Sequence, residues 1–305
     1  VSMFHRLTLF DLSKEGKIAA IDKVMTTADV PLQQSQQSTH ANYTLQQWCW
    51  NSPTEEGAME RINKHETKYT LLLESIHEIL SKQSTVDYVL QSSHQPIENI
   101  KLAVFDMDST LIQAEVMDEL AYAMGIGPQV ALITARSMAG ELDFEQSFRQ
   151  RLALLKGFTT NQLATINQNL ELMPGAQQLM QGLQERGVYC AILSGGFSYF
   201  ADRLALRLGM QEAFSNPLEE VEGKLTGQVT GPVLDASSKV ELMYQLQKSL
   251  GLSIHQCLAV GDGANDLPML NTAGLGVAFH GKPLVRQQAP HQLNQVDLDA
   301  LLHLV

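Results

Sequence analysis

The sequence predicts an α/β protein whose larger domain is built on a parallel sheet. Three short apolar runs, Leu102–Phe105, Val188–Leu193 and Cys257–Val260, are continuous rather than alternating, which is typical of strands buried on both faces. Helical patterns separate these runs, and each run is followed at once by small or acidic residues. Because ligands bind outside the carboxyl ends of the strands in an open α/β sheet, we expect these residues to converge.

Two domains are expected from the chain length and from a change of pattern near residue 97. A chain of 305 residues, of which 44% are hydrophobic, can form about two globular cores. The polar stretch Gln91–Asn99, which contains Pro96, separates two differently patterned regions. We therefore predict a small accessory domain over residues 1–97 and the larger domain over residues 98–305.

The accessory domain is predicted to be α/β, and its role stays open. Helical spacing is found at Ile18, Ile21, Val24 and Met25, and strand-like pairs are formed by Tyr43 with Leu45 and by Trp48 with Trp50. Residues 71–80 fit a helix or a strand.

A helical insertion is predicted after the first strand of the larger domain. Four helical patterns cover residues 115–125, 128–139, 143–156 and 160–171, with glycine or proline between them. This insertion, at about residues 114–173, would lie over the crevice as a four-helix cap. Further along, glycine spacing and alternation over Val221–Val229 predict a short hairpin.

Composition argues against several classes of partner. The net charge of −12 and the pI of about 5.2 leave no basic surface for nucleic acid and would repel an anionic membrane. No apolar run approaches the roughly 20 residues of a membrane helix, and the start does not resemble a signal peptide. The three cysteines, Cys49, Cys190 and Cys257, lack disulfide or zinc spacing, so a reducing cytoplasm is expected.

Paired carboxylates follow the first strand. Side chains alternate along an extended chain, so Asp106 and Asp108 would face one way and Met107 the other. Such a pair suits acid–base and metal chemistry, although acids also occur here as helix caps.

Later polar residues suit a bound phosphate and a metal. Ser194 and Gly195 offer a hydroxyl and backbone N–H groups, although the serine could also be a simple helix cap. Lys239 falls near a helix start, where the dipole disfavours a cation, so phosphate binding is favoured over a solvated lysine. Asp262 lies between two glycines and, with Asp106, supplies the hard oxygens that Mg²⁺ prefers.

The string Asp-Met-Asp-Ser-Thr-Leu at residues 106–111 resembles the D-x-D-x-T-[LV] signature of the haloacid dehalogenase superfamily. The superfamily's other motifs follow in order at Ser194, at Lys239 and within residues 261–266. The resemblance implies a Rossmann-like core and a Mg²⁺ cofactor held by Asp106, the Asp108 carbonyl and Asp262, supported by Asp266 and Asn265. It also implies that Asp106 is the nucleophile and Asp108 the general acid and base.

Substrate choice should lie with the cap, because the core reads only the phosphate. On the predicted helix from Asp143, Arg151 shares a face with apolar residues, whereas Arg149 has Glu145 one turn before it. The Arg151 guanidinium could hold a carboxylate in the crevice, or it could lie along the edge of the apolar stripe with its head in water. Glu115 opens the first cap helix, where an acid also favours the dipole.

Three stretches, residues 106–119, 138–151 and 194–198, resemble the phosphoserine phosphatase family, and the likeness covers about residues 100 to 300. It implies that the substrate is O-phosphoserine, that Glu115 binds its ammonium group and that Arg151 binds its carboxylate. It further implies that Met138 and Phe144 shield the site, while the phosphate is held by Ser194, Gly195, Lys239 and Asn265. Some members of this family carry a regulatory or dimerising first domain, which leaves a homodimer open.

Two other functions remain open at this point. A phosphatase of the same fold could act on another small phosphomonoester, or transfer the phosphoryl group to an acceptor alcohol such as homoserine. A non-catalytic phosphate sensor is a different class, against which Asp108 argues, because a sensor needs no general acid.

Overall fold

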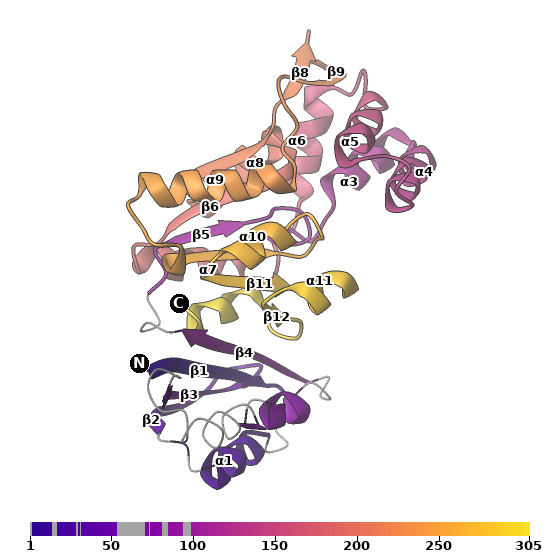
Figure 1. Ribbon diagram of the computed structural model, residues 1–305. Helices are drawn as coiled ribbons and strands as arrows, with labels where there is room; N and C mark the ends of the chain where they lie inside the picture. The colour runs from indigo at the N-terminus through magenta and orange to yellow at the C-terminus, as the bar shows by residue number, and fades with distance from the viewer. Residues whose placement is uncertain are drawn as a thin grey trace. The chain divides into compact units, whose positions relative to one another are not determined.

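The computed structural model describes residues 2–13, 17–28, 30, 32–53, 71–72, 74–80, 85–93 and 99–305. The chain forms two compact units (Figure 1). One comprises Val1–Asn99 with His291–Val305, and the other comprises Ile100–Pro290. Within the described residues, no helix is both long and apolar enough to cross a membrane.

The second unit is built on a five-stranded parallel sheet with the order β11-β10-β5-β6-β7. Its strands are β5 (Leu102–Phe105), β6 (Tyr189–Phe197), β7 (Glu212–Asn216), β10 (Cys257–Gly261) and β11 (Leu275–Phe279). The three predicted strands coincide with β5, β6 and β10, which confirms the expected parallel sheet.

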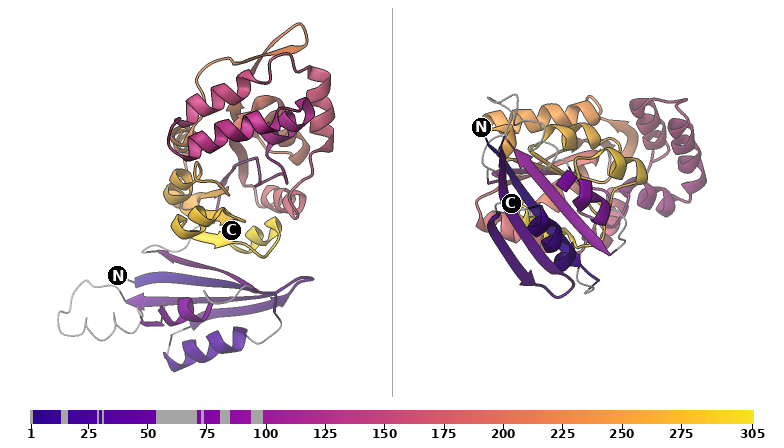
Figure 2. Two further views of the ribbon diagram at one scale, coloured as in Figure 1. Left: turned by 90° about the vertical axis from the view of Figure 1, so that its right-hand side faces the viewer. Right: turned by 60° about the horizontal axis from the view of Figure 1, so that its bottom comes forward.

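Helices cover both faces of this sheet (Figures 1 and 2). They are α7 (Ala176–Glu185), α8 (Ser198–Leu208), α9 (Ala236–Ser249), α10 (Leu267–Thr272) and α11 (Pro283–Gln288). On one face, Leu102 and Val104 pack with Met243 of α9 and Leu270 of α10. The alternate residues of β5, which face the other way, are also fully buried. Burial on both faces explains why the strand sequences do not alternate.

Four helices lie between β5 and α7, as the sequence predicts (Figure 1). They are α3 (Val116–Met124), α4 (Gly127–Met138), α5 (Phe144–Ala153) and α6 (Thr160–Asn169). Local chemistry sets their ends: Gly125 closes α3 in a left-handed conformation, and Asp143 and Thr159 form capping boxes at the starts of α5 and α6.

The predicted hairpin is formed by β8 (Leu218–Val221) and β9 (Lys224–Val229), and it belongs to the cap region. The backbone N–H of Leu225 donates to Phe158 O at 2.8 Å, and the N–H of Gly157 donates to Leu225 O at 2.8 Å. Gly227 has a φ of +82°, and a Cβ there would press on the backbone of Ala153, so a glycine is needed for this close approach.

The first unit has an antiparallel sheet with the order β2-β3-β1-β4-β12. Its elements are β1 (Ser2–Asp11), α1 (Lys17–Thr27), β2 (Leu32–Thr39), β3 (Thr44–Pro53), β4 (Val86–Ser93) and β12 (His291–Leu293). The helical spacing noted above corresponds to α1, and the strand-like pairs correspond to β3, except that Tyr43 lies one residue before the strand begins. Within the ambiguous segment, residues 71–72 and 74–80 are helical.

The last fifteen residues pack with the first unit rather than with the larger domain to which the sequence analysis assigned them. The Asp87 carboxylate accepts hydrogen bonds from the backbone N–H groups of Asn294 (2.8 Å), Gln295 (2.6 Å) and Val296 (3.2 Å). Gln47 Nε2 donates to His303 O at 2.7 Å. These contacts join segments more than 200 residues apart in sequence, so no local pattern could indicate them.

Candidate active site

Polar residues from three parallel strands meet at the carboxyl edge of the second unit's sheet. Asp106 follows β5, Asp262 follows β10, and Ser194 lies in the last part of β6. The backbone N–H of Asp106 donates to Val260 O at 2.9 Å, which continues the sheet pairing up to the first carboxylate. The strands therefore bring together side chains that are distant in sequence, as the sequence analysis expected.

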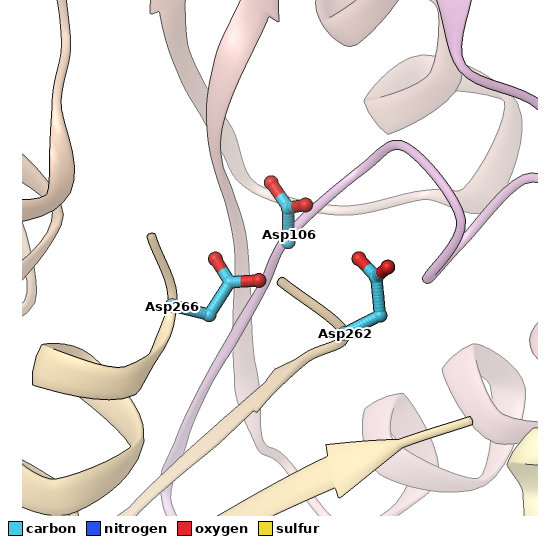
Figure 3. A group of neighbouring side chains, drawn as sticks. All are labelled: Asp106, Asp262 and Asp266. Carbon is cyan, nitrogen blue, oxygen red and sulfur yellow. The ribbon is translucent and has the colours of Figure 1, made fainter. Parts of the chain in front are cut away.

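Three buried carboxylates form a compact cluster (Figure 3). One oxygen each from Asp106, Asp262 and Asp266 lie within 4.8 Å of one another, and the three side chains converge from the ends of two strands and the start of α10. Asp266 also accepts a hydrogen bond from the backbone N–H of Gly263 at 2.9 Å. Concentrated carboxylate oxygens with little water around them suit a hard divalent cation.

Lys239 compensates part of this negative charge. Its Nζ donates to Asp106 Oδ1 and to Asp266 Oδ1, both at 2.6 Å, and its side chain is 1% exposed. A capping box between Asp235 and Ser238 starts α9 and fixes the backbone that carries the lysine. Burial opposes the charged ammonium, but the two carboxylates outweigh burial and raise the Lys239 pKa.

The aspartates hold their protons more tightly than usual. Burial, and then the charge of Asp266, raise the pKa of Asp106 to about 7. Burial raises the pKa of Asp262 to about 6, and burial together with the charges of Asp106 and Glu115 raises the pKa of Asp108 well above its ordinary value. Burial is the largest cause of each raised pKa and the neighbouring carboxylates add to it, so a bound cation would lower these pKa values by stabilising the ionised aspartates.

Asp108 lies between the cap and the glycine loop of β6. Its Oδ1 accepts a hydrogen bond from the backbone N–H of Val116, the first residue of α3, at 3.1 Å. A Cβ built on Gly196 would lie 3.0 Å from Asp108 Oδ2, so this oxygen faces the loop. Met107, between the two aspartates, is fully buried.

The Ser194–Gly196 loop is held by an asparagine that the sequence analysis did not select. Asn216 is fully buried at the end of β7, and its Nδ2 donates to Gly195 O (2.8 Å) and Gly196 O (3.1 Å). Its Oδ1 accepts from the backbone N–H of Leu234, just before α9 (2.7 Å). Ser194 Oγ accepts from the N–H of Gly196 at 2.9 Å. In sequence, an asparagine before a proline indicates only a turn.

Two cap residues of opposite charge, Arg151 and Glu115, interact electrostatically. Arg151 is partly buried on α5, and its Nε contacts Ser147 O at 3.4 Å. Among the described residues it forms no ion pair, and burial lowers its pKa while Asp118 and Glu115 oppose that effect. Glu115 precedes α3, and its carboxylate accepts a hydrogen bond from Ser109 Oγ at 3.1 Å. Arg149, by contrast, pairs with Glu145 at 2.7 Å on the exposed face.

Of the remaining predicted site residues, Phe144 and Asn265 lie beside glycines of the site, and Met138 does not reach it. A Cβ on Gly195 would lie 3.3 Å from the ring of Phe144, so this cap side chain reaches the glycine loop. Asn265 is partly buried beside Gly263. Met138, the last residue of α4, is 86% exposed and is not brought to the cluster.

Lys282, a second residue that the sequence analysis missed, reaches the site from the turn after β11. Its Nζ lies 3.2 Å from Glu115 Oε1 and 3.2 Å from Asp262 Oδ2. A lysine next to a proline in a surface turn carries no distinguishing local signal.

Comparison with known proteins places the chain in a family. The family model described as haloacid dehalogenase-like hydrolase matches residues 100–274. A Haemophilus influenzae phosphoserine phosphatase is 49% identical over 204 residues, which are 67% of this chain and 65% of the relative, just under two thirds of its length.

Solved structures show the same likeness. A HAD family hydrolase from Salmonella enterica serovar Typhi has a TM-score of 0.81 at 32% identity and covers 99% of this chain and 98% of its own. A phosphoserine phosphatase structure described as a phospho-aspartyl intermediate analogue has a TM-score of 0.63 at 37% identity and covers 68% of this chain and 100% of its own. By its motifs, its fold and these matches, the chain belongs to the haloacid dehalogenase-like hydrolases.

Proposed function

We propose that this protein is a Mg²⁺-dependent phosphatase that hydrolyses O-phosphoserine to serine and phosphate. The phosphatase half is supported by the buried Asp106–Lys239 pair beside Asp108 and by the names of the relatives. The main support for O-phosphoserine as the substrate is Arg151, a partly buried arginine without an ion-pair partner in the described chain. A guanidinium without an ion pair that interacts with the charge of Glu115 suits a substrate carboxylate, which it can bind with two parallel hydrogen bonds.

The cluster has the donor set that a divalent cation needs. Asp106 and Asp262 would hold Mg²⁺ through carboxylate oxygens, and the resemblance adds the Asp108 carbonyl, with Asp266 and Asn265 in support. When bound, the ion would offset the charge of the phosphate oxygens so that an anion can enter a carboxylate-rich site.

The chain's own residues then divide the chemistry. The Asp106 carboxylate attacks phosphorus to form an aspartyl-phosphate, while Asp108 gives its proton to the departing serine oxygen. The raised pKa of Asp108 supports this role, because it favours the protonated form that a general acid needs. The ionised Asp108 next takes a proton from water, which attacks phosphorus and frees Asp106 and phosphate. Lys239, Ser194, Gly195 and Asn265 would hold the phosphoryl oxygens, as the resemblance implies.

The cap residues would read the amino-acid part of the substrate. Arg151 would bind the carboxylate and Glu115 the ammonium group, while the ring of Phe144 shields the phosphate end. Met138 was assigned a shielding role with Phe144, and its exposed position gives that assignment no support. We further propose a cytoplasmic setting, which the three free cysteines suit, and a role in making serine, which is the product of the proposed hydrolysis.

A phosphate-release assay tests the proposed function. We expect Mg²⁺-dependent release from O-phosphoserine in preference to other phosphorylated amino acids and to sugar phosphates. Product analysis with and without an added alcohol distinguishes hydrolysis from phosphoryl transfer. Absence of phosphate release from every monoester would favour a non-catalytic phosphate-binding protein.

The residues before Ile97 should not be needed for activity. All the site residues lie within residues 100–290, and the phosphoserine phosphatase structure with a TM-score of 0.63 is matched over its entire length by 68% of this chain. We expect a fragment of residues 97–305 to release phosphate from O-phosphoserine. Circular dichroism controls for folding, and a folded but inactive fragment would show that the first unit contributes to the site.

Asn216 should position the phosphate loop. Replacing it with alanine leaves two carbonyls and one N–H unpaired in the interior, at a cost to the free energy of unfolding of about 1–3 kcal/mol. Asn216→Asp keeps the acceptor for Leu234, loses the donor to the loop and turns an acceptor oxygen towards the two loop carbonyls. We expect both variants to raise KM for phosphoserine, measured by steady-state kinetics. An unchanged KM in a folded Asn216→Asp variant would contradict the positioning role.

A further inference from the structure

Lys282 joins two carboxylates that the proposed function assigns to different cations. Glu115 is assigned to the substrate ammonium and Asp262 to the metal, yet the Lys282 Nζ lies 3.2 Å from an oxygen of each. The backbone supports this placement, because the N–H of Lys282 donates to Asp262 O at 3.0 Å. The lysine is therefore anchored beside the metal carboxylate while its side chain extends to the cap.

Neither helix formation nor stability explains this lysine. It occupies the N-cap position of the short helix α11, where the helix dipole disfavours a cation. Its side chain is 59% exposed, and exposed ion pairs contribute little to stability. A residue that violates a local preference without gain in stability is a candidate for function.

Four carboxylates of the site are paired with two lysines. Lys239 contacts Asp106 and Asp266, whereas Lys282 contacts Glu115 and Asp262. Burial opposes the charge on Lys282, but Asp262 and Glu115 outweigh burial and raise its pKa, so its ammonium group stays charged. Glu115 and Asp262, which Lys239 does not contact, thus share one cation on a long side chain.

We infer that Lys282 is a resident counter-cation, which the substrate's ammonium group replaces at Glu115 and which competes with the divalent cation at Asp262. One primary ammonium takes the place of another, so the positive charge beside Glu115 is conserved when an amino-acid phosphate binds. A ligand without an ammonium group leaves Lys282 in place and gains nothing from Glu115. Lys282 is then a specificity-determining residue, and the substrate part of this role rests on the proposed function.

Metal affinity tests the competition without any substrate. Mg²⁺ alone is titrated into the full chain by calorimetry, with Lys282→Met compared with the wild type and with Lys248→Met, which removes an exposed lysine on α9. Removing a positive charge near Asp262 should lower the Kd for Mg²⁺ roughly three- to tenfold. Lys282→Arg and Lys248→Met should stay close to the wild type. Unchanged or weaker Mg²⁺ binding by a folded Lys282→Met variant would overturn the competition.

The substrate part is tested with two ligands that differ only at the amino group. KM for O-phosphoserine is compared with the inhibition constant of 3-phosphoglycerate, in which a hydroxyl replaces the ammonium group. Without Lys282, the inhibitor leaves Glu115 unpaired, so the ratio of the inhibition constant to KM should rise roughly three- to tenfold. A constant or lower ratio would overturn the exchange. If the wild type does not hydrolyse phosphoserine, the proposed function fails, and the Mg²⁺ titration still decides whether Lys282 is a counter-cation.

Discussion

Asp106→Asn is expected to fold normally and to lose at least about 10³-fold in kcat, because an amide cannot act as the nucleophile in a covalent mechanism. Breaking a buried ion pair usually destabilises a protein, but Lys239 keeps its 2.6 Å contact with Asp266 in this variant. The variant also removes the Asp106 carboxylate, whose pKa is raised to about 7 in the folded protein. Its ionisation at neutral pH opposes folding, because the unfolded chain binds that proton less tightly.

Phosphate release and thermal unfolding measure this result together. Asp202→Asn is a matched control, because Asp202 is an exposed aspartate of the same unit on α8. A chelator should stop the wild-type enzyme, and added Mg²⁺ should restore it. Activity of Asp106→Asn close to that of Asp202→Asn would contradict the nucleophile, and turnover that survives chelation would contradict the metal requirement.

Arg151→Ala is expected to lower kcat/KM for O-phosphoserine by roughly 10²–10³-fold. If the guanidinium binds the substrate carboxylate, its removal leaves that charge unpaired in the site, a loss on the order of 3–5 kcal/mol by analogy with broken buried pairs. Arg151→Lys should recover only part of this loss, because a point charge cannot make the bidentate contact. Steady-state kinetics of both variants measure the effect.

Two controls separate substrate binding from support of the cap. Arg149→Ala removes an arginine from the same helix whose partner, Glu145, lies on the exposed face, so it should change little. A simple aryl phosphate has no carboxylate, so Arg151→Ala should affect its hydrolysis much less. Equal losses on the two substrates would show that Arg151 supports the cap or the phosphate, and the assignment to amino-acid phosphates would lose its main physical support.

Local sequence was sufficient to predict an element wherever its pattern lies within one continuous stretch of chain. The apolar runs that became β5, β6 and β10 could be recognised because a strand buried on both faces must be continuously hydrophobic. The cap helices could be recognised from their glycine breaks, and Asp143 and Thr159 do cap two of them. Convergence at the carboxyl edge followed from the rule for parallel sheets alone.

The tertiary structure decided the pairing of charges. Both Lys239 and Lys282 stand at helix starts, and only the fold shows that each reaches two carboxylates from other elements. For Arg151 the sequence left two interpretations, a guanidinium that enters the crevice and one that lies along the apolar edge with its head in water, and only the fold shows that the side chain is partly buried. The sequence gives the charge of a side chain, but only the fold determines which opposite charge lies close enough to pair with it.

By itself, the sequence determined the α/β class, the parallel strands of the larger unit and the family motifs, because strand burial and the motifs are properties of single segments. Only the tertiary structure showed that residues 291–305 pack with the first unit, that Asn216 holds the glycine loop and that Met138 is exposed. Each of these depends on contacts between segments far apart in sequence. Such contacts produce no recognisable pattern in the sequence of either segment, because each segment alone looks like an ordinary turn, cap or helix end.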